Sequence, residues 1–241
     1  MNKVLRTPLF IAIVMLSVSI LFTACNKDND DIGWPDAAVL TVVHGSPMSP
    51  RLDFALDSNR LRLYNFSYTK YLYNQLAYTG NRTLSVYKYG EDIKLLNKQI
   101  TLEKDKNYTL FIVDSLQNID AVLLQNATRS AEGDSVRIKF ANMCPDVASM
   151  DFYIKGDAAP FATNVSYKDA ADFMSVKAGY DQVIEVTQAG QTAVLAASLP
   201  INLSRGNIYT IWTSGFKGIA TGEGIITVST IKHTRPPGYW H

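Results

Sequence analysis

His44, Ser46 and Asp53 are the residues whose types and spacing could carry hydrolytic chemistry. A histidine base beside an acid and a hydroxyl group is the arrangement of a catalytic triad, and imidazole and carboxylate groups are also zinc ligands. The other two histidines, His233 and His241, lie at the C-terminal end of the sequence. One hypothesis is therefore a hydrolase that uses His44 and Asp53.

An internal repeat argues against that hypothesis. Residues 42–47 (VVHGSP) and 52–56 (LDFAL) match residues 140–145 (FANMCP) and 150–154 (MDFYI) without a gap, 98 positions later. The repeat places an asparagine at the position of the histidine. Asparagine can form hydrogen bonds in a turn, but it cannot act as a base, so the repeated motif favours a structural role.

The repeat leads us to predict no catalytic residue, no metal site and no cofactor. Cys144 replaces the serine of the motif and is predicted to be a small packed side chain rather than a reactive thiol. The two aspartates are expected to bond loop backbone. The residues predicted to form structural turn motifs are His44, Ser46, Pro47, Asp53, Pro145 and Asp151.

Tyrosines are concentrated in the first half of the chain, and they are the candidates for ligand binding. Aromatic side chains can stack on sugars or anchor protein partners. Alternatively, tyrosines that alternate along strands fill a core and place their hydroxyl groups at its rim. We take Tyr71, Tyr73 and Tyr78 as the candidate ligand-binding residues. The tyrosines of this segment are Tyr64, Tyr68, Tyr71, Tyr73, Tyr78, Tyr87 and Tyr89.

The segments that must position these residues are predicted to be β-strands. Val39, Thr41 and Val43 recur with a period of two, as do Val136, Ile138 and Phe140, and this period is typical of a half-buried strand. The repeat continues to the end of the chain with an offset that grows to 101 residues, as single-residue changes in loops would produce. The sequence therefore predicts an all-β protein of two tandem immunoglobulin-like Greek-key β-sandwiches.

Two further tyrosines support the sandwich prediction. Leu102 precedes Tyr108 by six positions, and Leu203 precedes Tyr209 by the same interval. This spacing resembles a tyrosine corner, in which a phenol group bonds the backbone just upstream of it. We expect domain 1 at residues 37–126, domain 2 at 134–233 and a C-terminal tail at 234–241.

The N-terminus has the pattern of an export signal. Lys3 and Arg6 precede the apolar run 9–22, which is too short to span a bilayer as a helix. The sequence LFTAC that ends at Cys25 resembles the lipobox of bacterial lipoproteins, in which the cysteine is acylated. We therefore predict a signal peptide at 1–24 and a lipidated tether at 25–36.

Composition limits the partners of the mature chain. Removing residues 1–24 leaves 241 − 24 = 217 residues with 23 − 2 = 21 basic and 22 acidic side chains. This balance of charge excludes the basic footprint of a nucleic-acid-binding protein. Lipidation of Cys25 would leave Cys144 alone, so both cores must be stabilised without an intrachain disulfide.

The repeated motif also resembles a known family. The pattern V-x-x-H-x-S-P, followed by Asp-Phe, is similar to that of the bacterial domain-of-unknown-function family 4397. The resemblance spans Ala38–Gln125 and, more loosely, Ser135–Lys232, where Asn142, Met143 and Cys144 depart from the motif. It implies an extracytoplasmic β-sandwich and supplies no active site. The acidic tether that begins with Asn26 and Lys27 is similar to the export signal of Bacteroidota surface lipoproteins, which implies an outer-membrane location.

Three hypotheses of function follow. The first is a non-enzymatic interaction module of the cell envelope, with the membrane as partner through its lipid anchor and an unknown protein or glycan as ligand. The second is a carbohydrate-binding accessory lipoprotein of a polysaccharide-uptake system. The third is the hydrolase described above.

Lipidation can be tested directly. We expect cells that express the full chain to incorporate labelled palmitate at Cys25, since several buried acyl chains make a firm anchor. Mass spectrometry of the mature N-terminus would locate the label. Unlabelled protein would contradict the predicted address.

Overall fold

The computed structural model describes residues 36–233. The predictions for the signal peptide, for Cys25 and for the tail at 234–241 lie outside these residues. Within the described part, no helix is long and apolar enough to cross a bilayer.

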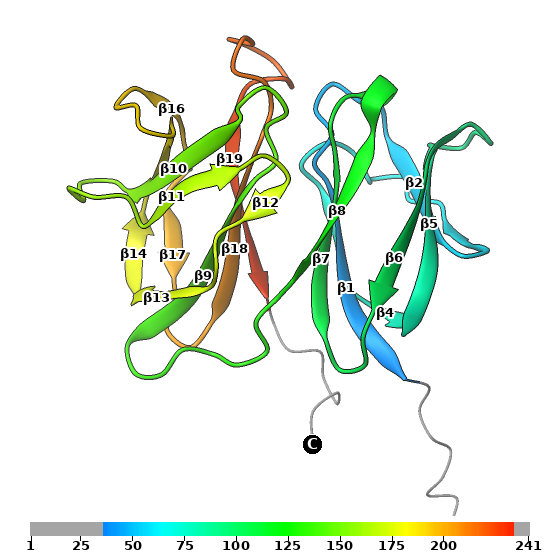
Figure 1. Cartoon of the computed structure of the whole chain (residues 1–241), viewed down its shortest axis with the longest axis horizontal. Coiled ribbons are helices and arrows are strands. Elements are labelled where there is room, and N and C mark those ends of the chain that lie inside the picture. The colour runs from blue at the N-terminus through cyan, green and yellow to red at the C-terminus, as the bar shows by residue number, and fades with distance from the viewer. Residues whose placement is uncertain (1–35, 234–241) are drawn as a thin grey trace, which may run out of the picture. The chain divides into compact units, whose positions relative to one another are not determined.

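The first copy of the repeat consists of short strands and one 3₁₀ turn (Figure 1). β-Branched and aromatic residues are concentrated in the strands Ala37–His44 and Asn107–Val113, which is the composition that suits a pleated, buried surface. In chain order the elements are β1 (Ala37–His44), β2 (Leu52–Leu56), β3 (Asn59–Leu61), β4 (Tyr71–Tyr78), β5 (Gly80–Lys88), β6 (Lys94–Leu102), β7 (Asn107–Val113), η3 (Leu116–Asn118) and β8 (Asp120–Gln125).

The second copy repeats this series with more interruptions. Its elements are β9 (Ser135–Asn142), β10 (Ser149–Ile154), β11 (Ala162–Ser166), β12 (Asp169–Ala170), β13 (Met174–Lys177), β14 (Gly179–Gln182), β15 (Ile184–Gln188), β16 (Val194–Ala197), β17 (Ile201–Leu203), β18 (Ile208–Ser214) and β19 (Thr227–His233). Strands β12 and β13 together take the place of β4, because both pair with β9.

The two copies have the same strand order. One sheet of the first copy runs β4-β1-β7-β8 and the other β3-β2-β5-β6; in the second copy the corresponding orders are β13-β9-β18-β19 and β11-β10-β15-β16. The register is also repeated, because Leu40 lies opposite Tyr108 in a parallel pair, and Ile138 lies opposite Tyr209. The prediction of an all-β fold with two tandem sandwiches is confirmed.

The strand order adds a detail to the immunoglobulin-like prediction. In immunoglobulin domains the first strand lies at the edge of its sheet. Here β1 lies inside its sheet, because it pairs antiparallel with β4 on one side and parallel with β7 on the other. β1 is therefore a central strand of its sheet, and the turn motif follows its C-terminal end.

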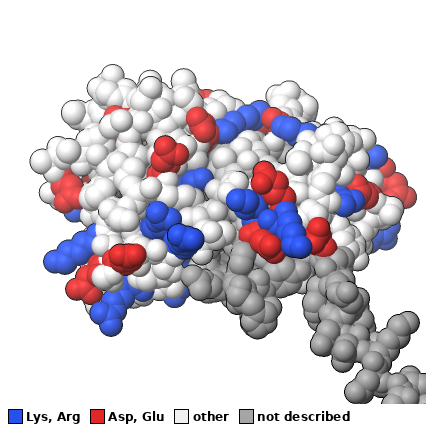
Figure 2. Space-filling model, turned by 60° about the horizontal axis from the view of Figure 1, so that its bottom comes forward, with Lys and Arg blue, Asp and Glu red and all other residues white. Residues whose placement is uncertain are grey.

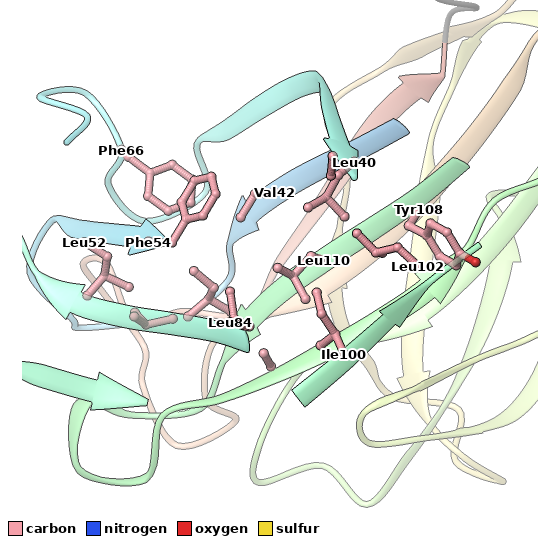
Figure 3. Packing of buried hydrophobic residues seen from close by; sticks show 14 of the residues in the cluster. Leu40, Val42, Leu52, Phe54, Phe66, Leu84, Ile100, Leu102, Tyr108 and Leu110 are labelled. Carbon is pink, nitrogen blue, oxygen red and sulfur yellow. The ribbon is translucent and has the colours of Figure 1, made fainter. Parts of the chain in front are cut away.

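Each sandwich has its own apolar core between its two sheets. In the first copy the inward residues of β1, β2, β5 and β7 interdigitate with side chains from β6 and the β3–β4 loop (Figure 3). The labelled residues of this core are Leu40, Val42, Leu52, Phe54, Phe66, Leu84, Ile100, Leu102, Tyr108 and Leu110. The core of the second copy is built in the same way around Phe140 and Phe152, whose ring centroids are 5.0 Å apart.

A third apolar cluster joins the two sandwiches, and we call it the seam. The sheet β4-β1-β7-β8 packs through its outer face against the corresponding sheet of the second copy. The ring centroids of Phe111 and Trp212 lie 5.3 Å apart at this seam. Its buried members are Val43, Phe111, Val113, Ala141, Met143, Trp212 and Ile231.

The seam brings equivalent positions of the repeat together. Phe111 and Trp212 correspond at an offset of 101 residues. Tyr68 and Tyr167 correspond at 99, and each reaches across the seam: the Tyr68 hydroxyl lies 2.8 Å from Ser214 Oγ, and the Tyr167 hydroxyl donates to Asp114 Oδ2 at 3.1 Å. Such reciprocal contacts are those of a twofold interface between like subunits, here within one chain.

The seam explains why the expectation of a half-buried strand is wrong for β1, and it buries β7 and β18 in the same way. Every residue of these strands is buried, because one face packs in a sandwich core and the other in the seam. Gly45, just after β1, permits the close approach of the copies. A Cβ atom there would lie 3.1 Å from the Ile112 carbonyl oxygen and 3.3 Å from Trp212 Cζ3.

We expect Trp212→Ala to destabilise both copies together. Truncating a fully buried tryptophan costs about 3–5 kcal/mol, and the lost contacts belong to both sandwiches. Urea unfolding followed by circular dichroism should show one transition at a lower urea concentration. Leu199→Ala, at a side chain that is 84% exposed, is the matched control. Two separate transitions in the unchanged protein would contradict a coupled seam.

Candidate functional site

His44 ends β1 as a buried hydrogen-bonding residue. Its Nε2 atom lies 3.0 Å from the Pro50 carbonyl oxygen, which can only accept, so Nε2 carries the proton. The ring packs against Phe66 and Tyr68, with centroids 5.5 and 6.4 Å away. Burial lowers the pKa of His44 to about 4. The imidazole is therefore neutral near pH 7, and its N–H holds the β1–β2 loop.

Asn142 acts in the second copy as His44 does in the first. Its amide nitrogen donates to the carbonyl oxygens of Val147 at 3.0 Å and Val165 at 3.2 Å. Its amide oxygen accepts from the backbone N–H of Cys144 at 3.0 Å. Both side chains thus tie the end of the first strand to the loop that follows.

The remaining motif residues lie in the same turns. Ser46 Oγ is 2.6 Å from Ser49 Oγ and also donates to the Asp114 carbonyl oxygen. Pro47 is buried and Pro145 half-buried. Cys144 is fully buried in the core of the second copy, and burial raises the pKa of its thiol to about 12. A thiol in that state is protonated and unreactive.

Asp53 and Asp151 each join two loops. Asp53 accepts from the backbone N–H groups of Leu63 at 3.3 Å and Gly90 at 3.1 Å, and Arg60 lies 2.9 Å from it. Asp151 correspondingly accepts from the N–H groups of two residues, Asn164 at 2.7 Å and Gly190 at 2.9 Å. His44 and Asp53 have different partners, so the geometry does not assemble them into a triad.

The phenol groups of Tyr108 and Tyr209 bond the backbone upstream in the same way. The Glu103 N–H donates to Tyr108 Oη at 3.2 Å, and the Ser204 N–H donates to Tyr209 Oη at 3.0 Å. The Tyr209 hydroxyl in turn donates to the Asn202 carbonyl oxygen at 3.2 Å. These bonds fix the turns that precede β7 and β18.

Residues 36–233 contain no cluster of three or more His, Cys, Asp or Glu side chains placed to hold a metal ion. The most developed polar cluster crosses the seam instead. Asp120 accepts from Lys98 Nζ at 2.8 Å and from Lys168 Nζ at 2.9 Å. Burial alone would raise its pKa, but the two lysines lower it to about 2. These lysines line a groove of about 420 Å³, and their charge is balanced by Asp120 together with Asp114, whose carboxylate lies 3.8 Å from Lys168 Nζ.

The three tyrosines selected from the sequence do not form one surface. Tyr71 and Tyr73 lie together on β4, with ring centroids 6.2 Å apart. The Tyr73 hydroxyl donates to the Lys232 carbonyl oxygen at 2.6 Å, so it ties β4 to β19. Tyr78 is 63% exposed at the far end of β4, roughly 20 Å away at the rise of an extended strand.

A different pair of tyrosines forms a more organised surface. The Arg51 guanidinium carbon lies 4.6 Å from the ring centroids of both Tyr64 and Tyr89, and the two rings meet edge to face at 6.3 Å. We call these three residues the tyrosine–arginine surface. The Tyr64 ring is 69% exposed.

A second arginine of the first copy is also stacked on a tyrosine ring. Arg60 lies 4.1 Å above the Tyr87 ring while it bonds Asp53 and Asp92, each by one charged hydrogen bond. Its guanidinium is therefore engaged, whereas Arg51 donates to the Tyr64 carbonyl oxygen at 3.2 Å and is otherwise exposed. On the face shown in Figure 2, basic and acidic side chains are interspersed, and no large patch of one charge is visible. Selectivity for a ligand on this face would therefore have to come from individual side chains.

Sequence reasoning missed the tyrosine–arginine surface, because its members come from three loops. Arg51 precedes β2, Tyr64 lies between β3 and β4, and Tyr89 follows β5. Only the concentration of tyrosines in residues 64–89 pointed to this region.

Comparison with known proteins assigns the chain to a family. The sequence model of the family described as "Domain of unknown function (DUF4397)" matches residues 38–153 and 139–228. The chain belongs to this family. No curated protein matches its sequence.

Two solved structures are similar at a low level. One is a family 26 carbohydrate-binding module from Eubacterium rectale Amy13K in complex with maltoheptaose, with a TM-score of 0.25, 10% identity, and coverage of 85% of this chain and 100% of that one. The other is a family 41 carbohydrate-binding module from streptococcal virulence factors, with a TM-score of 0.25, 12% identity, and coverage of 79% and 96%. A TM-score of 0.25 is too low to transfer a ligand.

Acid should destabilise the fold through two buried histidines. His233 Nε2 lies 2.8 Å from Thr210 Oγ1, and burial together with nearby Lys139 lowers its pKa to about 4. Both His233 and His44 titrate near pH 6.5 when unfolded. The stability that the neutral, buried histidines contribute is therefore fully present above pH 6.5 and is lost as the pH falls to 4. The loss is up to about 3 kcal/mol for each residue.

The repeat supplies matched controls for this prediction. Asn142 occupies the position of His44, and Asn126 occupies that of His233 and bonds Thr109 as His233 bonds Thr210. We expect His44→Asn to remove about half of the loss between pH 6.5 and 4, measured as urea midpoints, and the double variant with His233→Asn to remove most of it. An unchanged pH profile in the double variant would refute the assignment.

Proposed function

We propose that the chain is a non-enzymatic binding module of the cell envelope, anchored through lipidated Cys25 at the outer membrane, whose tyrosine–arginine surface binds carbohydrate. The observation that carries this proposal is the exposed Tyr64 ring, held beside the Arg51 guanidinium, which itself contacts Tyr89. An aromatic ring that is largely exposed to water and also held in a fixed position supports a role in ligand binding.

The chemistry of the surface suits a sugar. The C–H face of a pyranose ring can stack on an aromatic face such as that of Tyr64, and the hydroxyl groups of the sugar can accept from guanidinium N–H groups. Contacts with two rings restrict the motion of Arg51 before a ligand arrives. Less conformational entropy is then lost on binding, which favours affinity.

The residues that could take part in catalysis are already hydrogen-bonded or buried, which supports a non-enzymatic role. His44 donates its N–H to a backbone carbonyl, Asp53 is bonded by two N–H groups and Arg60, and Cys144 is a buried, protonated thiol. The side chains of His44, Asp53 and Cys144 are fully buried.

A protein partner is the second candidate, and β4 favours it. This strand is the edge of its sheet and pairs with β1 alone among the described strands. Tyr71, Leu76 and Tyr78 are exposed on it. An exposed edge with apolar side chains is suited to β-strand addition by an extended peptide.

We expect Tyr64→Ala to weaken binding to a neutral polysaccharide by about 2- to 12-fold, which corresponds to the 0.5–1.5 kcal/mol of an aromatic stacking contact. Affinity gel electrophoresis against a panel of bacterial and plant polysaccharides would measure it.

Two further variants separate the alternatives. Tyr71→Ala tests the strand β4 surface, and Leu199→Ala is the control for loss of exposed apolar area. If Tyr71→Ala reduces the retardation of the protein by polysaccharide in the gel and Tyr64→Ala does not, the site lies on β4. Failure of the whole panel to retard the unchanged protein would count against carbohydrate binding.

A further inference from the structure

We infer that a groove of the second copy, lined by Lys177, Tyr180 and Arg205, is a binding site for an acidic sugar, that is, a pyranose bearing a carboxylate or a sulfate group. The inference rests on the proposed function in taking carbohydrate as the ligand. It concerns a different site, on the other copy of the repeat.

Three segments form the groove, beside β13, β14 and β17 at the lower left of Figure 1. The first is Asp134, just before β9, the second runs from Lys177 to Tyr180, and the third is the turn from Leu203 to Arg205. The buried Leu203 is among the lining residues, and the volume is about 310 Å³. This volume is at the lower end of the range of small-ligand sites and suits one sugar ring.

Backbone hydrogen bonds hold the walls in place. The Ala178 N–H donates to the Asp134 carbonyl oxygen at 2.8 Å, and the Gly206 N–H donates to the Ser135 carbonyl oxygen at 2.9 Å. Gly206 has a φ angle of +71°, which glycine adopts without strain and which closes the turn after Arg205. The side chains of the groove therefore project from a fixed frame.

The side chains combine an aromatic face with two cations. Tyr180 is 81% exposed, and Lys177 is also exposed. Arg205 lies 3.3 Å from Asp134, with both side chains largely in water, where such a pair contributes little. An acidic sugar can thus compete for the Arg205 guanidinium, which binds carboxylate and sulfate groups through two parallel N–H donors. Its ring would stack on Tyr180.

The first copy shows that this combination is not a general property of the repeat. There the Thr79 N–H donates to the Asp36 carbonyl oxygen at 3.2 Å, and Lys104 pairs with Asp36 at 2.6 Å, so the same frame is present. Tyr78 stands at the position of Lys177, and Asn81 at that of Tyr180. The second cation of the first copy, Arg82, donates to the Tyr78 and Thr79 carbonyl oxygens and pairs with Asp57, so it is engaged, and the aromatic ring stands on Tyr78 instead of at the position of Tyr180.

The test uses the full mature chain and two matched ligands, trigalacturonate and its methyl ester, which differ only in charge. A sulfated disaccharide as a third probe distinguishes sulfate from carboxylate recognition. Titration calorimetry at low salt should show that the ester binds at least about tenfold more weakly than the acid, because the ester cannot form the charged bidentate contact. Higher salt should weaken binding of the acid.

The variants Arg205→Gln and Lys177→Gln should each lower the affinity for an acidic probe about fivefold, and Tyr180→Ala about tenfold. Lys155→Gln is the control, because Lys155 is an exposed lysine that pairs with Glu185 at 3.4 Å elsewhere on the second copy. Equal binding of acid and ester, no binding of any acidic probe, or an equal loss in Lys155→Gln would overturn the inference.

Measuring Tyr64→Ala in the same titrations separates this inference from the proposed function. If Tyr64→Ala leaves all binding unchanged while Arg205→Gln weakens binding of the acid, the groove is supported and the tyrosine–arginine surface is not. The reverse pattern supports that surface and removes the groove.

Discussion

The packing of Phe111 against Trp212 is the contact on which the arrangement of this protein depends. It closes a seam between two sheets that would otherwise expose apolar faces to water, and it removes the outer faces of β1, β7 and β18 from solvent. Burial of apolar area on both faces of a strand is the main source of its stability. The two copies of the repeat are therefore packed together as one unit and are not joined by the linker alone.

The seam also constrains where a ligand can bind. The turn motifs that follow β1 and β9 lie next to the seam, and their polar side chains bond backbone carbonyl oxygens of their own copy, as His44, Ser46 and Asn142 do. Residues held in this way stabilise loops, and because they are fully buried they are not accessible to a ligand. The two proposed binding surfaces, the tyrosine–arginine surface and the groove around Tyr180, lie instead on outward loops and turns.

Duplication followed by divergence is a consistent physical account of the groove around Tyr180. The frame on which it lies is the same in each copy, with an aspartate carbonyl oxygen that accepts a backbone hydrogen bond and a cation paired to that aspartate. Substitutions at exposed positions on this frame change its chemistry at little cost in stability, because they leave the core and the seam intact. The two copies can thus present different side chains on one frame.

The sequence by itself determined the repeat, the all-β class and the turn residues, since strand alternation and the spacing of Pro47, Pro145, Tyr108 and Tyr209 are local features of the chain. It also predicted a structural role for His44, because the matching Asn142 cannot act as a base. Only the tertiary structure decided that the strands of the seam are buried twice and that Arg51 lies between Tyr64 and Tyr89. Both facts depend on contacts between segments far apart in the chain, which no local pattern encodes.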